Sequence, residues 1–165
     1  MIIWYCLMTL AIVAADQGVK LWAVRALGPG GSMGLIPGVF HLTYAENRGA
    51  AFSILEGRLG FFVAVTVAMV GLLLYMAVKG YIRGSFGKLA TVFIIGGALG
   101  NLTDRLCRGY VVDLFDFRLI HFAIFNVADV FITIGGVMLA VYFIFLEGKN
   151  LEESGDGNQE PESRP

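Results

Sequence analysis

Leu59 to Val78 is a run of 20 residues without a charged side chain, and no other feature constrains the fold of this chain as strongly. About 20 apolar residues in an α-helix cross the hydrocarbon core of a bilayer. The composition agrees, because 57% of the residues are apolar and only 15% are charged, whereas soluble proteins have roughly 45–50% and about 25%. We therefore predict an integral membrane protein.

The N-terminal run predicts a membrane span over residues 2–25. As a helix it would extend roughly 36 Å, enough to cross a bilayer. A cleaved signal peptide is the alternative, because Val13, Ala14 and Ala15 resemble a small-residue cleavage site. The span is favoured, since no Lys or Arg precedes the run and the apolar pattern resumes after Lys20.

Two more spans are predicted over residues 87–106 and 126–146. Gly96 and Gly100 lie four apart in the third span, a spacing that lets transmembrane helices pack closely. We expect residues 1–146 to form a single membrane-embedded domain. The acidic tail, 147–165, lacks the apolar content needed to fold and is expected to be a disordered cytoplasmic segment.

Long connections follow the first and third spans, so both lie on the same side of the membrane. The first begins with the glycine-rich residues 28–34, expected to be a flexible entry, and the alternation over 39–44 then predicts a strand. The second holds a similar apolar stretch over 110–117. We expect a small sheet that rests on the lipid surface.

Charge counting leaves the orientation open. The link over 79–88 carries a dense cluster of basic residues, which the positive-inside rule places in the cytoplasm together with both termini. The two long connections and their flanks also carry several Arg residues, so the raw count is nearly even.

Charged residues inside predicted spans require a physical reason, because each costs roughly 2.5 kcal/mol or more at the bilayer centre. Asp16 and Lys20 are four apart on one helical face, where they can form a structural ion pair. Asn101 and Arg105 repeat this spacing in the third span, with Asp104 on an adjacent face. Two interpretations of this second group stay open: charges that reach the membrane interface, or groups that bind a substrate.

Carboxylates gather around the start of the fourth span. Asn126 and Asp129 are three apart and share one helical face, and the helix N-terminus would explain Asp129 alone. Asp113 and Asp116 lie just upstream in an apolar loop. Two carboxylates a few Å apart cannot both ionise cheaply, so one pKa rises and the pair can act as acid and base toward a bound water.

Other chemistries are disfavoured. A net charge of -1 with scattered basic residues does not predict nucleic-acid binding. With two His residues and no HExxH motif, we expect neither a metal nor a cofactor. The motifs of serine and cysteine nucleophiles are absent from the sequence, and we expect Cys6 and Cys107 to be packing residues.

Four blocks stand out in order along the chain. They are Asp16 to Lys20 (DQGVK), Glu46 to Phe52 (ENRGAAF), Gly100 to Arg105 with Val111 to Asp113 (GNLTDR and VVD), and Phe125 to Asp129 (FNVAD). Together, on a four-span chain of this length, they resemble the bacterial lipoprotein signal peptidases, also called signal peptidase II. The resemblance runs from the first span to about Leu146. It implies an all-α integral membrane protein with four transmembrane helices and a small extracytoplasmic β-sheet.

The resemblance also implies an activity. The protein would be an aspartyl endopeptidase of the bacterial cytoplasmic (inner) membrane, with both termini cytoplasmic and its site near the outer face. It would remove signal peptides from prolipoproteins by cutting before a diacylglyceryl-modified cysteine. By position, Asp113 and Asp129 would be the catalytic pair. The residues that would line the site or bind substrate are Asn47, Asn101, Arg105 and Asn126, with Asp16 and Lys20 in support.

We expect a monomer whose partners are prolipoproteins and membrane lipid.

The sequence departs from the family pattern in two places. The stretch between Asp113 and Asn126 is short, and Val130 stands where the family often has a small polar residue.

Two other classes of function are alternatives. In a proton-coupled membrane carrier, or a subunit of one, the charged residues Asp16, Lys20, Arg105 and Asp129 would form a relay. No inverted repeat is evident, which disfavours a carrier. A structural assembly subunit would not need the set of Asn and Asp residues. Cleavage of a diacylated peptide separates these classes.

Overall fold

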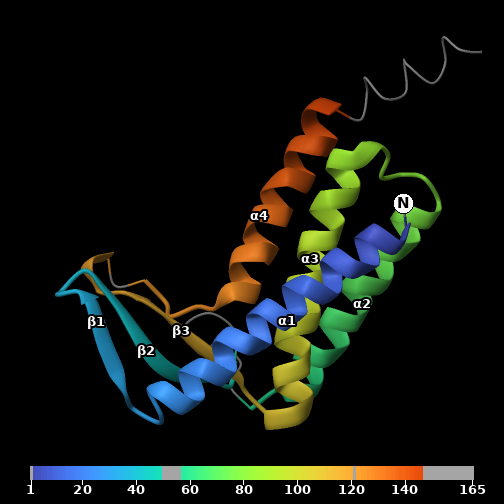
Figure 1. Cartoon of the computed structure of the whole chain (residues 1–165). Helices are drawn as coiled ribbons and strands as arrows, with labels where there is room; N and C mark the ends of the chain where they lie inside the picture. The colour runs from blue at the N-terminus through green and yellow to red at the C-terminus, as the bar shows by residue number, and fades with distance from the viewer. Residues whose placement is uncertain (1, 50–56, 121, 147–165) are drawn as a thin grey trace, which may run out of the picture.

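The computed structural model describes residues 2–49, 57–120 and 122–146, and it has a helical bundle with a small sheet at one end (Figure 1). The long helices are α1 (Ile2–Ala26), α2 (Leu59–Val78), α3 (Gly84–Arg108) and α4 (Val127–Val141), and the π-helical turn η3 (Tyr142–Leu146) continues α4. All four spans are long and apolar enough to cross a membrane. The four-span prediction is confirmed, with α3 longer at both ends than expected.

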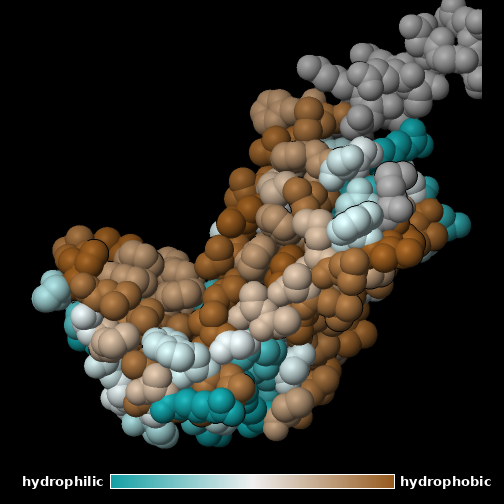
Figure 2. Space-filling view, viewed as in Figure 1, coloured by the Kyte–Doolittle hydropathy of each residue, from teal (hydrophilic) through white to brown (hydrophobic). Residues whose placement is uncertain are grey.

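α3 is the central helix of the bundle and contacts α1, α2 and α4. In its most apolar 18-residue segment 61% of the residues are buried, against 6–11% in the other three helices. The outer helices therefore turn most of their apolar surface outward, and hydrophobic residues dominate the visible face of the bundle in Figure 2. An apolar surface of this extent suits contact with lipid.

Glycines on α3 allow α1 to approach closely. A Cβ on Gly96 would lie 2.9 Å from Cγ2 of Ile12, and a Cβ on Gly100 would lie 2.7 Å from Oδ2 of Asp16. The matched four-residue spacing on both helices brings their backbones together. The close packing predicted at Gly96 and Gly100 is confirmed.

The two long connections meet in one antiparallel sheet with the strand order β1, β2, β3. Strands β1 (Ser32–Ile36) and β2 (Phe40–Asn47) come from the first connection, and β3 (Val111–Phe117), followed by the short helix η2 (Arg118–Ile120), comes from the second. Both connections therefore lie at the same end of the bundle, as predicted, and each predicted strand is present.

The expectation of a flexible entry over residues 28–34 is wrong, because β1 begins at Ser32. Ser32 pairs with Thr43, and Met33 pairs with Leu42. All five residues of β1 are exposed, so no alternation of buried and exposed positions marks this strand in the sequence. Pairing with β2 orders it instead.

The expectation that both cysteines are packing residues is wrong, since each is free and exposed. The buried residues of α1 form one stripe: Ile12, Asp16, Lys20 and Ala23. Cys6 lies off this stripe, and Cys107 lies near the C-terminal end of α3, beyond its last buried residue, Asp104. Helical geometry therefore turns both thiols outward.

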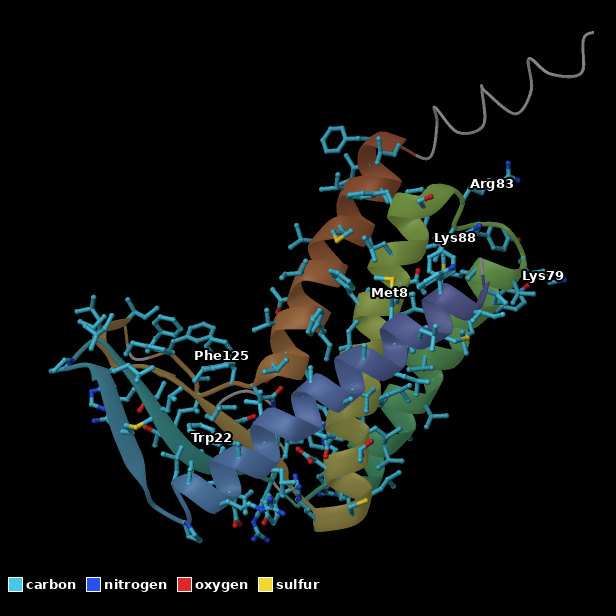
Figure 3. The ribbon with its side chains drawn as sticks, viewed as in Figure 1. Met8, Trp22, Lys79, Arg83, Lys88 and Phe125 are labelled. Carbon is cyan, nitrogen blue, oxygen red and sulfur yellow. The ribbon has the colours of Figure 1, made fainter. Side chains whose placement is uncertain are left out.

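The sheet and the basic link lie at opposite ends of the bundle. Figure 3 places Lys79, Arg83 and Lys88 near the end where α1 begins, and Phe125 beside the sheet. The end of the sheet at the β1–β2 turn exposes large apolar side chains: Leu35, Ile36, Leu119, Ile120 and Phe122. Figure 2 shows hydrophobic residues over one side of the sheet and hydrophilic residues along its lower edge. The sheet is therefore amphipathic.

We expect Gly97→Val to destabilise the bundle and to displace the start of α4. A Cβ at Gly97 would overlap the backbone carbonyl of Ala128, which cannot move aside as the tip of a side chain can. Overpacking of this kind typically costs about 1–3 kcal/mol. Thermal unfolding in detergent measures the effect, with Gly136→Val as the control, because nothing lies within 4 Å of a Cβ at Gly136. Equal melting temperatures for the two variants would contradict the close packing.

Candidate active site

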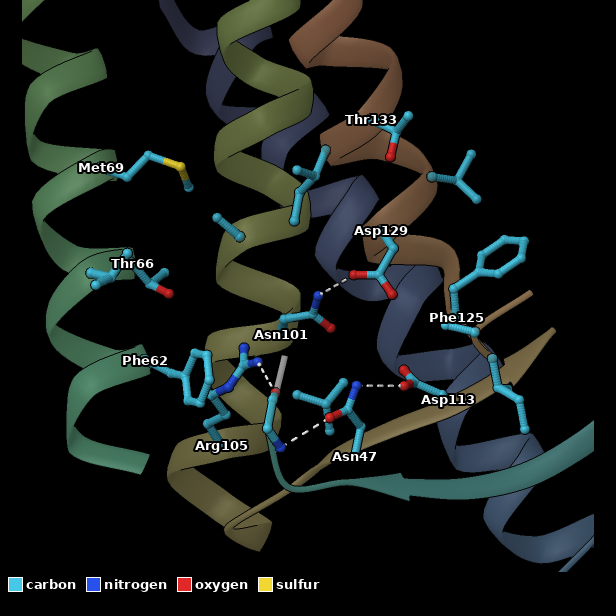
Figure 4. Close-up of a pocket in the computed structure, with 18 of the residues that line it drawn as sticks. Asn47, Phe62, Thr66, Met69, Asn101, Arg105, Asp113, Phe125, Asp129 and Thr133 are labelled. Carbon is cyan, nitrogen blue, oxygen red and sulfur yellow. Dashed lines mark hydrogen bonds between the residues drawn. The ribbon is translucent and has the colours of Figure 1, made fainter. Parts of the chain in front are cut away.

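A cavity of about 610 Å³ lies between α2, α3 and α4, beside the ends of β2 and β3 (Figure 4). Much of its wall is apolar and includes Val65, Met69 and Ile132. Hydrogen-bonding residues also line it, among them Asn47, Asn101, Arg105, Asp113 and Asp129. Figure 4 shows these five side chains grouped at one end of the cavity.

β3 carries Asp113 to the cavity, and its side chain is buried. Its Oδ1 accepts a hydrogen bond from Nδ2 of Asn126 at 2.6 Å, and its Oδ2 accepts one from Nδ2 of Asn47 at 3.0 Å. Asn47 is the last residue of β2 and pairs with Val111 of β3. The register of the sheet therefore places Asn47 within reach of Asp113.

The first turn of α4 holds Asp129. The side chain of Asn126 accepts the backbone N–H of Asp129 at 3.0 Å, and Oδ2 of Asp129 accepts the backbone N–H of Asn126 at 3.1 Å. This reciprocal arrangement is a capping box. Oδ1 of Asp129 accepts a hydrogen bond from Nδ2 of Asn101 at 2.8 Å. The carboxylate is thus fixed by a helix N-terminus and by α3 while it lines the cavity.

Asn126 links the two carboxylates. Its buried Nδ2 donates to Asp113 and also to Oδ1 of Asn101 at 3.1 Å, while its Oδ1 accepts from the backbone of Asp129. Both donors and the acceptor of the amide are used, which fixes the orientation of the side chain. One residue therefore positions a carboxylate on the sheet relative to a carboxylate on the helix.

Lys20 supports this arrangement from a fully buried position. Its Nζ lies 2.9 Å from Oδ2 of Asp16 and 2.9 Å from Oδ2 of Asp104, and it donates to Oδ1 of Asn101 at 2.8 Å. Three acceptors satisfy the three donors of the ammonium group. Since Oδ1 of Asn101 accepts from Lys20, its Nδ2 must face Asp129. The predicted ion pair between Asp16 and Lys20 is confirmed.

Asp16 and Asp104 each hold a backbone group next to a cavity carboxylate. Oδ1 of Asp16 accepts the N–H of Ala128 at 2.9 Å, and Oδ2 of Asp104 accepts the N–H of Val112 at 3.1 Å. These two N–H groups belong to the residues immediately before the two cavity carboxylates. The buried layer therefore fixes the backbone on which each carboxylate is carried.

Two partly buried residues in contact with this layer, Gln17 and Arg108, were not predicted as part of the site, and for Asp104 the sequence left a role in binding open. Nε2 of Gln17 donates to Oδ1 of Asp104 at 3.2 Å and to the carbonyl of Gly100 at 3.1 Å. Arg108 forms an ion pair with Asp104 at 2.5 Å. The four-residue spacing of Asp104 and Arg108 was a usable signal, because it repeats that of Asp16 and Lys20. No comparable signal marks Gln17.

Arg105 reaches the cavity from α3. Its guanidinium lies 5.0 Å from the ring centroid of Phe62 on α2, and it donates to the carbonyl of Gly49 at 3.4 Å. The interpretation of Arg105 as a charge that only reaches the membrane interface does not fit this position. It lines the cavity beside the segment that follows β2.

Asp116 lies away from the cavity. Residues three apart on a strand point to opposite faces, so Asp116 and Asp113 are on different sides of β3. Asp116 accepts hydrogen bonds from Nε of Arg118 at 2.9 Å and from Oγ1 of Thr43 at 2.7 Å. Burial alone would raise the pKa of Asp116, but these two hydrogen bonds hold it below its usual value.

Burial raises the pKa of Asp113 to about 7, and repulsion from Asp129 acts in the same direction. Hydrogen bonds from Asn126 and Asn47 and the charge of Lys20 oppose this rise. Near neutral pH, Asp113 therefore exchanges a proton readily beside a second carboxylate. Within residues 2–49, 57–120 and 122–146, no group of three or more His, Cys, Asp or Glu is arranged to hold a metal ion.

Residues 8–145 match the sequence profile of the family described as Signal peptidase (SPase) II. The chain belongs to the signal peptidase II family. The lipoprotein signal peptidase of Clostridioides difficile (strain 630) is 43% identical over 148 residues, which cover 88% of this chain and 98% of the relative. That of Brevibacillus brevis is 46% identical over 147 residues, which cover 88% and 97%.

Two solved structures, both described as bacterial membrane enzymes, share the fold with a TM-score of 0.79 each. One is 30% identical and covers 99% of this chain and 96% of its own; the other is 32% identical and covers 88% and 96%. The chain is therefore a multi-pass bacterial membrane protein and a protease of the signal peptidase II family. Every predicted site residue lies within the matched region.

Lys20→Met should strongly destabilise the protein, because it leaves Asp16 and Asp104 buried without the cation that they share. Breaking a buried ionic group in this way costs roughly 3–5 kcal/mol. Thermal unfolding in detergent measures the loss, and Lys79→Met, which removes an exposed lysine, is the control. If both variants melt at the same temperature, Lys20 has no ionic role in the fold.

Proposed function

We propose that this protein removes signal peptides from prolipoproteins by aspartyl catalysis, cutting before the diacylglyceryl-modified cysteine. The observation that carries the proposal is the pair of carboxylates, Asp113 and Asp129, held by Asn126 at the polar end of an otherwise apolar cavity. The name "lipoprotein signal peptidase" shared by the relatives supports the substrate class. The catalytic roles are those that the resemblance implies by position, and the geometry and charge of the pair support them.

The two carboxylates have different tasks in this proposal. Asp113, whose pKa of about 7 lets it keep a proton near neutral pH, is the general acid. Asp129, held in the first turn of α4 by hydrogen bonds with an amide and a backbone N–H, is the general base. Asp129 takes a proton from water as the oxygen attacks the scissile carbonyl carbon. Asp113 then protonates the leaving amine as the C–N bond breaks.

The remaining polar residues bind and orient in this scheme. Asn47 and Asn101 direct amide donors at the carboxylates, and Arg105 presents a cation at the cavity beside Gly49. A substrate carbonyl bound near these donors would lie beside the acid and the base. The apolar part of the wall would take the lipid portion of the modified cysteine, so the substrate can enter laterally from the bilayer.

The arrangement of charges supports an orientation with both termini in the cytoplasm and the site near the outer face. The basic link lies at the bundle end away from the sheet (Figure 3), and the positive-inside rule places it in the cytoplasm. Trp4 and Trp22 are exposed near the two ends of α1, about 27 Å apart along a helix, which suits two interfacial anchors. The apolar side of the sheet would then rest on the outer lipid surface.

A carrier with a proton relay is disfavoured by the state of Lys20. A relay residue needs a free site for proton exchange, whereas Lys20 is fully buried and donates to three acceptors. This contact set suits a structural cation and leaves the proton chemistry to the cavity carboxylates.

Asp113→Asn and Asp129→Asn should each abolish cleavage of a diacylated lipobox peptide as completely as the double substitution does. If both carboxylates activate one water, removal of either one disables the unit, so their effects are not additive. The measurement is the rate of the single cut before the cysteine by purified protein in detergent. Asp116→Asn is the matched control, because Asp116 lies on the opposite side of β3 and should retain the parental rate. Substantial activity in either single variant would exclude the pair, and absence of any cut by the parent would overturn the proposed function.

The cleavage rate should fall as the pH rises through about 7, because Asp113 then loses the proton that the leaving amine requires. At low pH the rate should fall again once both carboxylates are protonated, which gives a bell-shaped profile. Its two apparent pKa values belong to the pair. A rate that does not change on the alkaline side of neutrality would contradict the assignment of the acid.

A further inference from the structure

A polar cluster outside the cavity surrounds the end of β2. We call it the Glu46 clasp, and it consists of Tyr44, Glu46, Arg48 and Tyr110. Oε1 of Glu46 accepts a hydrogen bond from the hydroxyl of Tyr44 at 3.2 Å, and Oε2 forms an ion pair with Arg48 at 2.9 Å. With its one proton on Glu46, the Tyr44 hydroxyl accepts from that of Tyr110, 3.3 Å away, and the Arg48 guanidinium lies 5.4 Å from the ring centroid of Tyr110. The clasp therefore joins β2 to the residue just before β3.

The clasp and the cavity lie on opposite sides of the same short segment. Successive side chains of a strand alternate between its two faces, so Glu46 faces away from the side that Asn47 presents to Asp113. Beyond the strand, Oδ1 of Asn47 accepts the backbone N–H of Gly49 at 3.0 Å, and the carbonyl of Gly49 accepts from Arg105 at 3.4 Å. Residues 47–49 therefore contact two candidate site residues, while the clasp holds the same residues from the other side.

We propose that the Glu46 clasp positions Asn47 and Gly49 for the reaction, with Glu46 and Arg48 as positioning residues that do not touch substrate. This inference deepens the proposed function and rests on it. The clasp fixes where β2 ends relative to β3, and that in turn fixes the direction of the Asn47 amide and of the Gly49 carbonyl. Neither the four sequence blocks nor the cavity lining assigns such a role to Glu46 or Tyr110.

A distinctive consequence follows at Asp113. The groups that face this carboxyl are Asp129 from α4, Lys20 from α1, Arg105 from α3 and the amides of Asn126 and Asn47. The hydrogen bond from Asn47 lowers the pKa of Asp113. Release of the clasp should weaken that hydrogen bond, so the pKa of Asp113 should move upward from about 7. A merely structural ion pair would not move it.

The test is Glu46→Ala, which removes both acceptor oxygens of the clasp from an exposed position. Asp116→Ala is the control, because Asp116 forms an ion pair of the same length, 2.9 Å, with Arg118 two residues later, at the end of β3 opposite to Asn47. We expect Glu46→Ala to slow cleavage about tenfold, within the roughly hundredfold that a 1 Å misplacement can cost. Asp116→Ala should stay near the parental rate.

The pH dependence supplies the second measurement. The alkaline limb of the cleavage profile should shift to higher pH in Glu46→Ala, as in Asn47→Ala. The double variant should shift no further than Asn47→Ala alone, since both changes act through one hydrogen bond. Infrared titration of the Asp113 carboxyl, identified by its loss in Asp113→Asn, should show the same shift without any substrate.

The outcomes separate this inference from the proposed function. An unshifted Asp113 titration in Glu46→Ala, together with a shifted one in Asn47→Ala, overturns the clasp and leaves the function standing. Equal losses of rate and of melting temperature in Glu46→Ala and Asp116→Ala also overturn it, because the pair is then only structural. If the parent cuts no lipobox peptide, the proposed function fails, and the infrared titration still decides whether the clasp positions Asn47.

Discussion

The structure depends on one buried cation. Lys20 has no exposed surface, and its ammonium group is shared between Asp16 on its own helix and Asp104 and Asn101 on α3. Arg108 adds a second positive charge to Asp104, so two carboxylates are balanced by two cations. Buried charges are tolerated only when they are paired and fully hydrogen-bonded. Within the described residues, every buried side-chain nitrogen or oxygen has a partner.

This buried charge layer connects the membrane helices to the site. Each of its carboxylates accepts the backbone N–H that precedes a cavity carboxylate, at Ala128 on α4 and at Val112 on β3. The glycines of α3 allow α1 and α4 to approach closely enough for these contacts. Packing of small residues thus sets the distances between the helices. The buried charge layer then fixes the backbone positions of Asp129 on α4 and Asp113 on β3.

Much of this organisation could be predicted from the sequence, because the bilayer imposes simple length and polarity rules. The uncharged run of α2, the Gly96 and Gly100 spacing and the Asp16 and Lys20 pair each follow from such local rules. The strand β1 could not be predicted, since its order comes from pairing with β2 and not from a pattern of its own. The contact of Gln17 with Asp104 joins residues 87 positions apart, and no local periodicity encodes such a pairing. The outward position of Cys6 depends on which stripe of α1 meets α3, which is also a property of the assembled bundle.

The ion pair within α1 has a consequence for how the protein enters the membrane. α1 is synthesised before α4, and Ala128, whose N–H Asp16 accepts, follows Asp16 by 112 residues. During that interval the helix must enter the bilayer with an aspartate and a lysine in its apolar length, a costly state for isolated charges. Because the two side chains are one turn apart and reach each other at 2.9 Å, the helix carries its own counter-ion. Pairing within the helix lowers the cost of burying these two charges before the later helices are present, and in the folded protein the same two residues contact Asp104 and Ala128.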